Sequence, residues 1–246
     1  MKQHFINNAW LAPTSGEYIE VLDPSDGLVF DKLARGNAHD MDVAVRAARA
    51  AFDGAWGRLT ATERGRLLQK LSQKMIDHLD ELALLESRDC GKPLKQARAD
   101  VTAISRYFEF YAGAADKLMG ETIPYQNGYT VLTIREPQGV TGHIIPWNYP
   151  LQIFGRSVGG SLAAGNACVV KPAEDACLSI LRVAELAADP RLAKLSGVVI
   201  NSATDEVLFD RNANVPASTA SVMKTLTAAA AILTLGPNYR VETRVY

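Results

Sequence analysis

The sequence predicts an α/β protein in which a helical layer precedes a short parallel sheet, and a β-hairpin with one further helix follows. Apolar residues recur at three- and four-residue spacing through most of 40–120, as one face of a helix requires. Between 129 and 187, β-rich segments alternate with helical ones, which is the rhythm of parallel strands joined by crossover helices. This rhythm breaks near residue 188.

The helical layer is expected behind a small β-rich start. Short apolar runs broken by turn residues in the first 36 residues predict strands and turns that form an edge layer outside the core. Four helices follow, and the second opens on a capping-box pattern, in which Thr60 and Glu63 exchange hydrogen bonds. The predicted helices run from Asp40 to Gly54, from Thr60 through Leu79, then to a stop near Gly91, and from beyond Pro93 to Gly120.

The sheet is expected to begin where β-branched and aromatic residues gather. Residues Tyr129 to Arg135 and the run VTGHII predict two strands. The segment LQIFGRSVGGSLAAG then reads as a helix closing at Gly165, ACVVK as a buried strand, and Asp175 to Ala187 as another helix. Strand, helix, strand, helix predicts a parallel sheet.

A different unit is expected after the break. Strands at Gly197 to Asn201 and Glu206 to Asp210 are joined by four residues, which is too short for a parallel crossover and predicts an antiparallel hairpin in its place. An Ala-rich helix from about Ala220 to Leu235 follows. The predicted domains are therefore 1–187 and 188–246.

Charge and cysteine content exclude several functional classes. The 26 basic and 27 acidic residues give a net charge of -1, so neither nucleic acid nor a membrane is expected as a partner. The N-terminus shows no signal-like apolar stretch, and a cytoplasmic location is expected. Cys90, Cys168 and Cys177 form no CxxC pair, so the sequence predicts neither a disulfide framework nor a metal site.

The segment GHIIPWNYPLQIFGRSVGGSLAAGNACVVKPAE resembles the NAD-dependent aldehyde dehydrogenase family, and the resemblance extends back through RYFEFYAGAADKLMGETIP to cover about 1–187. It implies the cofactor-binding part of that family, with a truncated Rossmann-like sheet. It also implies that Asn148 donates its amide to the oxyanion formed when a cysteine thiolate attacks the aldehyde. The remaining implied residues are Ile145, Pro146 and Trp147 as a wall for the dinucleotide, and Lys171 and Glu174 at the adenosine ribose hydroxyls.

The position of Lys171 and Glu174 makes physical sense for NAD. Both follow a predicted buried strand at its carboxyl end, where open parallel sheets hold ligands. A carboxylate there accepts from two hydroxyls and repels a 2'-phosphate, which favours NAD over NADP. KPAE alone more often forms a solvated turn, but its combination with PWN at the family spacing favours the functional interpretation.

The family chemistry also needs a nucleophilic cysteine and a glutamate base, which lie downstream in the family. Neither segment occurs here, and the surroundings of the three cysteines favour structural roles. The expectation is therefore NAD binding at most, with a small aldehyde as a further ligand and no turnover. Oligomerisation through the strand at 129–135 is also expected, whereas the choice of aldehyde is left open.

The second unit carries an SxxK tetrad, Ser221-Val222-Met223-Lys224. Its setting resembles the serine D-alanyl-D-alanine carboxypeptidases of the penicillin-binding superfamily, which implies Ser221 as nucleophile and Lys224 as base. The later S-x-N and K-T-G motifs of that superfamily are absent. Two alternatives to a cofactor-binding fragment therefore stay open, which are an incomplete serine acyl-enzyme and an inactive truncation or fusion.

Overall fold

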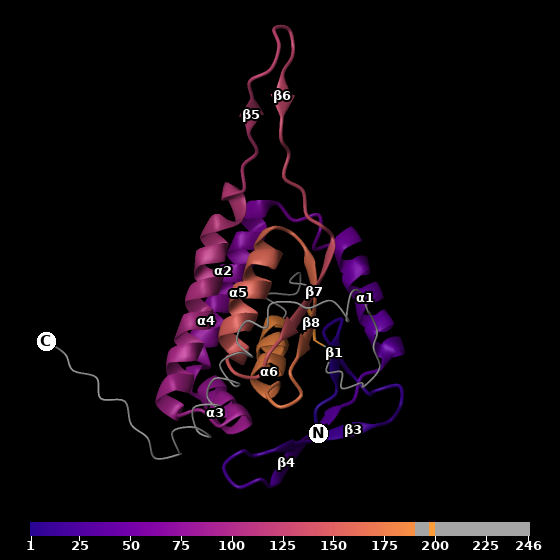
Figure 1. Ribbon diagram of the computed structural model, residues 1–246, viewed down its shortest axis with the longest axis vertical. Coiled ribbons are helices and arrows are strands. Elements are labelled where there is room, and N and C mark those ends of the chain that lie inside the picture. The colour runs from indigo at the N-terminus through magenta and orange to yellow at the C-terminus, as the bar shows by residue number, and fades with distance from the viewer. Residues whose placement is uncertain (190–196, 200–246) are drawn as a thin grey trace, which may run out of the picture. The chain divides into compact units, whose positions relative to one another are not determined.

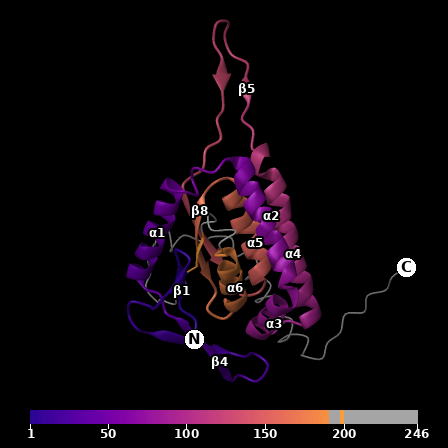
Figure 2. The same ribbon diagram turned by 180° about the vertical axis from the view of Figure 1, so that it is seen from behind.

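The structure is a computed structural model that describes residues 1–189 and 197–199. The chain divides into two compact units, 1–204 and 205–246, and the described residues belong to the first (Figures 1 and 2). The predicted boundary near residue 188 stays a prediction. None of the helices in the described part is both long and apolar enough to cross a lipid bilayer.

The helices of this unit follow their sequence signals closely. The capping box at the start of α2 is confirmed, because Thr60 Oγ1 accepts from Glu63 N while the Glu63 side chain accepts from Thr60 N. Gly91 ends α3 with a φ of 72°, a left-handed conformation that favours glycine. The helices are α1 (Ala38–Asp53), α2 (Ala61–Asp77), α3 (Leu79–Cys90), α4 (Leu94–Ala114) with a 3-10 turn (Ala115–Lys117), α5 (Pro150–Ala163) and α6 (Leu178–Ala187).

A five-stranded sheet with the order β2-β1-β9-β8-β7 lies between two helical layers. Helix α1 packs on one face, and α5 and α6 pack on the other, with α4 packed outside α5 (Figures 1 and 2). Two further two-stranded sheets, β3-β4 and β5-β6, stand apart from it. The strands are β1 (His4–Ile6), β2 (Ala9–Leu11), β3 (Tyr18–Leu22), β4 (Val29–Ala34), β5 (Thr122–Ile123), β6 (Val131–Leu132), β7 (Val140–Ile145), β8 (Ala167–Pro172) and β9 (Gly197–Val199).

The predicted β-hairpin after residue 188 is corrected in its first strand. β9 pairs in parallel with β8, with Val170 opposite Val199, and antiparallel with β1. Helix α6 and the residues after it supply the crossover that a parallel connection needs. The expected partner strand at 206–210 lies outside the described residues, as does the predicted helix at 220–235.

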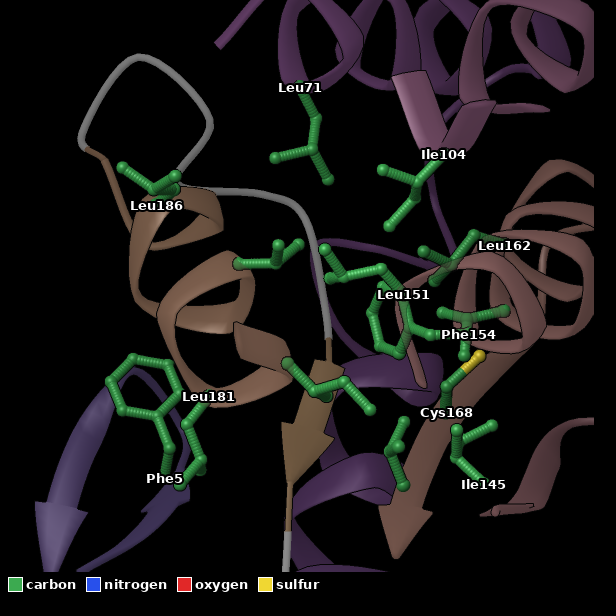
Figure 3. Packing of buried hydrophobic residues seen from close by; sticks show 14 of the residues in the cluster. Phe5, Leu71, Ile104, Ile145, Leu151, Phe154, Leu162, Cys168, Leu181 and Leu186 are labelled. Atoms are coloured by element: carbon green, nitrogen blue, oxygen red, sulfur yellow. The ribbon is translucent and has the colours of Figure 1, made fainter. Parts of the chain in front are cut away.

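The expectation that the first 36 residues lie outside the core is also wrong in part. Phe5 and Ile6 of β1 are only 3% exposed, because β1 pairs between β2 and β9 inside the main sheet. Figure 3 shows Phe5 and Leu181 in the same packed interior, together with Leu71 from α2 and Ile104 from α4. The three-residue length of β1 concealed its central position, since short runs also occur at sheet edges.

The strand predicted at 129–135 is shorter than expected and belongs to a separate arm. Only Val131–Leu132 forms a strand, and it pairs with Thr122–Ile123 instead of joining the main sheet. Both views show this arm projecting away from the helices (Figures 1 and 2). Its large apolar side chains are exposed, namely Ile123, Tyr125, Tyr129, Leu132 and Ile134.

Candidate functional site

Two turns lie side by side at the carboxyl ends of β7 and β8. The parallel register places Ile145 opposite Pro172, so the chain leaves both strands at the same edge of the sheet. One turn, Pro146–Tyr149, leads into α5, and the other, Ala173–Cys177, leads into α6. This edge is where open α/β sheets bind their ligands.

The first turn presents an aromatic ring and an amide. Ile145 is buried at the end of β7, whereas the Trp147 side chain is 60% exposed. Pro146 and Asn148 are also exposed. Within the described residues the Asn148 amide has no hydrogen-bond partner, so it is available to a ligand.

The second turn presents an ion pair. Lys171 Nζ lies 2.6 Å from Glu174 Oε2, and both side chains are partly buried. The pair satisfies each charge while leaving the other Glu174 oxygen available. A ribose with two adjacent hydroxyls could therefore find both a donor and an acceptor here.

A cleft of about 430 Å³ borders these turns. Its lining includes Trp147 and Glu174, the acidic Asp89 and Asp175, and strand β3 with the turn after it. A volume of this size is within the range of small-molecule sites. The structure therefore brings together Trp147, Lys171 and Glu174, which the sequence predicted as one site.

The three cysteines are buried or half-buried, and their thiol pKa values are raised. Burial raises the pKa of the Cys90 thiol to about 11, and the charge of Glu86 adds to this. Burial likewise raises the pKa of Cys168 to about 11 and raises that of Cys177 well above its usual value. A thiol in this state holds its proton near neutral pH and is a poor nucleophile.

Buried charges beneath the two turns are the feature that the sequence interpretation missed. Glu86 and Asp89 of α3 are 0% and 2% exposed, and Lys92 Nζ lies 2.8 Å from Glu86 Oε1. Burial raises the pKa of Glu86, against the opposing Lys92 charge, and raises that of Asp89 to about 7. The signal was present, because Glu86 and Asp89 continue the buried stripe that begins with Leu82 and Ala83.

The second predicted site is not described. Ser221 and Lys224 lie outside residues 1–189 and 197–199, so their predicted roles as nucleophile and base stay predictions.

Comparison with known families supports a chain of two parts. The sequence profile of the aldehyde dehydrogenase family matches residues 10–207. The profile of the D-Ala-D-Ala carboxypeptidase 3 (S13) family matches residues 180–246. The two matches overlap over 180–207, which includes β9.

Individual relatives agree with the first match. Hydroxyisobutyraldehyde dehydrogenase of Mycolicibacterium austroafricanum is 46% identical over 182 residues, which make up 74% of this chain and 36% of that protein. A structure described as that of an aldehyde dehydrogenase from Burkholderia cenocepacia has a TM-score of 0.79 at 64% identity, over 81% of this chain and 42% of its own. The NAD+ complex of the Bacillus cereus aldehyde dehydrogenase has a TM-score of 0.76 at 35% identity, over 82% and 41%.

These similarities confirm the predicted α/β fold class for the described unit. The chain spans about a third of the length of the curated relatives that it matches and about two fifths of the solved structures. The similarity therefore covers the sheet edge with its two turns. The rest of each relative lies outside the matched region.

Proposed function

The chain belongs to the aldehyde dehydrogenase family, and from this premise we propose that its first unit binds NAD at the carboxyl ends of β7 and β8. The observation that carries the proposal is the Lys171–Glu174 pair beside the exposed Trp147, at the edge of a parallel sheet. The NAD+ complex of the Bacillus cereus relative supports the same cofactor.

The residues present fit an adenosine ribose and a flat ring. Glu174 keeps one carboxylate oxygen outside its pair with Lys171, and two ribose hydroxyls can donate to it. The Trp147 indole has an exposed apolar face, against which a planar part of the dinucleotide can pack. Pro146 is exposed beside it, whereas Ile145 is only 1% exposed and would support the wall from beneath.

NAD, when bound, supplies the hydride acceptor for oxidation of an aldehyde. The contribution of this chain is to orient the dinucleotide and to offer the Asn148 amide as a donor to the oxygen of the aldehyde under attack. A preorganised donor of this kind contributes about 3 to 4 kcal/mol to transition-state stabilisation. We propose a small aldehyde as a further ligand beside Asn148.

We further propose that these 246 residues do not turn over aldehyde by themselves. Cys90, Cys168 and Cys177 all carry thiols whose pKa is raised by burial, so a thiolate nucleophile would have to come from elsewhere. The expected state is an NAD complex without product. Mixing the chain with NAD and acetaldehyde and following absorbance at the NADH band tests this, and NADH formation that depends on the chain would contradict it.

Cofactor binding is tested by thermal unfolding of the whole chain across a series of NAD concentrations. A ligand that binds only the folded state raises the melting temperature by mass action, with a free energy of about 2.7 kcal/mol at a hundredfold excess over Kd. Lys171→Ala with Glu174→Ala should abolish most of this rise.

The matched control is Arg106→Ala with Glu109→Ala, which removes another ion pair of three-residue spacing on the exposed surface of α4. This control should respond to NAD as the parent does. If NAD does not change the melting temperature of the parent chain, the proposal is wrong.

A second candidate function rests on the S13 profile match over 180–246. We propose that this segment is the nucleophile-bearing start of a serine carboxypeptidase, joined to the dehydrogenase segment as a fusion, with Ser221 as nucleophile and Lys224 as base. Because the partner motifs are absent from the sequence, slow or no acylation is expected. Covalent labelling by a fluorescent penicillin, lost on Ser221→Ala, would favour an acyl-enzyme, and no labelling would favour the inactive fusion.

A further inference from the structure

Helices α5 and α6 both begin without a side-chain cap of their own. The first peptide N–H groups of a helix have no partner inside the helix and need one elsewhere. These two helix starts directly follow the turns that carry Trp147 with Asn148 and Lys171 with Glu174. The groups that accept hydrogen bonds from these helix starts therefore also hold the two halves of the proposed cofactor site in place.

A single carboxylate of α3 reaches both helix starts. Glu86 Oε1 accepts from the Leu151 backbone N–H in α5 over a long 3.5 Å, and Glu86 Oε2 accepts from the Ser179 hydroxyl in α6 at 2.5 Å. One turn further along α3, Asp89 Oδ2 accepts from the Leu178 backbone N–H at 2.7 Å. Both carboxylates are buried.

Lys92 ties this arrangement to the first turn. Its ammonium lies 2.8 Å from Glu86 Oε1 and 2.7 Å from Asp100 Oδ2, and 5.0 Å from the centre of the Tyr149 ring. The Gln152 amide donates to Asp100 Oδ1 at 2.7 Å. The side chains that contact Tyr149, Leu151 and Gln152 therefore come from α3, from α4 and from Lys92 in the short segment between them.

We infer that Glu86, with Asp89 and Lys92, is a positioning group that holds the Trp147–Asn148 turn and the Lys171–Glu174 turn in one fixed relation. Carboxylates at helix N-termini are favoured by the helix dipole. Ion pairs taken fully out of water gain little over apolar packing of the same volume. A cluster that only filled space could therefore be apolar, whereas one that bonds the starts of two helices needs hydrogen-bond acceptors for Leu151, Leu178 and Ser179.

The inference rests on the proposed NAD site, so its first test does not involve NAD. Amide hydrogen exchange is measured on the full chain as the parent, as Glu86→Ala, and as Ser72→Ala. Ser72 is a matched control because it is buried and hydrogen bonded to Ser105 between α2 and α4, away from both turns. Exchange of the β7 amides corrects each variant for its loss of global stability.

Glu86→Ala should speed exchange at the start of both α5 and α6 about tenfold beyond that correction. In α5 the Leu151 N–H loses its acceptor, and in α6 the Ser179 hydroxyl loses the carboxylate that anchors the first turn. Ser72→Ala should leave both starts at the corrected parent rate. Faster exchange at α5 alone, or at neither helix, would overturn the inference, since the group would then not join the two turns.

The second test compares NAD dissociation constants. Glu86→Ala should weaken NAD binding about tenfold, while Glu86→Gln, which keeps an acceptor for Leu151 and a partner for Ser179, should recover most of it. Ser72→Ala should bind as the parent does. Equal NAD affinity in Glu86→Ala and the parent would overturn the positioning role. Where the parent itself does not bind NAD, the proposed function fails and the exchange test alone decides the inference.

Discussion

The β7–β8 pair and the β5–β6 pair are built from similar residues and have opposite surroundings. β7 and β8 pair over six residues inside a five-stranded sheet, and β8 is buried at nearly every position. β5 and β6 pair over two residues in an isolated arm whose side chains are mostly exposed. Both strand pairs are rich in β-branched residues, so intrinsic preference does not separate them.

The difference shows that packing decides what a strand contributes. An isolated two-stranded hairpin is marginal in water, whereas a strand covered on both faces shares the stability of the whole core. β8 lies between α1 on one side and α5 on the other. The proposed cofactor site lies at the end of the packed β7–β8 pair, whereas the arm is exposed and accessible to a partner.

The largest expected effect comes from the same substitution made in both pairs. Val170 in β8 is 1% exposed and Leu132 in β6 is 59% exposed. Val170→Asp buries an unpaired carboxylate and should lower the free energy of unfolding by roughly 5 kcal/mol. Leu132→Asp should change it by less than about 0.5 kcal/mol. Urea titration of both variants measures this, and equal losses would mean that the arm belongs to the cooperative core.

The sequence predicts the rigid region better than the arm for the same physical reason. Apolar periodicity and the ACVVK run report burial, so α2 and β8 were predicted to within about two residues, whereas α4 ends at Ala114 instead of the predicted Gly120. The sequence of the arm shows no pattern of buried residues. A prediction from β propensity alone therefore made its strand too long. The central place of β1 was missed because pairing with β9 joins residues far apart in the chain, which local patterns do not report.

For the site, family motifs identified the exposed residues and missed the buried ones. Trp147 follows the end of β7 and Lys171 is the next-to-last residue of β8, and the sequence marks both strand ends clearly. Glu86 contacts Leu151 in α5 and Ser179 in α6, and Lys92 pairs with Glu86 and Asp100. Only the three-dimensional fold brings these residues together. The sequence does hold one signal for these buried residues, because Glu86 and Asp89 are polar residues on the buried face of a helix. The sequence-based prediction of the site did not use it.

The second prediction concerns pH and applies to the rigid region alone. Burial raises the pKa of Asp89 from 3.8 to about 7, so the folded chain keeps a proton that the unfolded chain loses. The free energy of unfolding should therefore fall as the pH rises from about 4 to about 7, and this one group should account for roughly 3 kcal/mol of the fall. Above about pH 7 its contribution should level off. Asp89→Asn should remove that slope, as urea midpoints at pH 5 and pH 8 would show. If the fall in stability with pH persists in Asp89→Asn, another titrating group must cause it.

The third prediction compares two threonine hydroxyls that accept from a backbone N–H. Thr60 Oγ1 caps α2 at 3.2 Å from Glu63 N, and Thr133 Oγ1 in the arm lies 2.7 Å from Glu121 N. Thr60→Ala should cost about 1 kcal/mol of unfolding free energy, because helix caps contribute to the cooperative unit. Thr133→Ala should cost close to nothing despite its shorter bond, since the arm opens locally. A larger loss from Thr133→Ala would reverse the comparison.

The smallest expected effect on stability is the one that gives the arm a role. We propose that a second copy of the chain pairs with it, because unpaired strand edges and exposed apolar side chains promote association. Ile123→Ser with Leu132→Ser should leave the unfolding free energy within about 0.5 kcal/mol. The same variant should shift the chain toward monomer in sedimentation velocity runs over a concentration series. Leu84→Ser, at an exposed leucine of α3, is the control and should sediment as the parent. A parent chain that is already monomeric throughout the series would leave the arm without a self-association role.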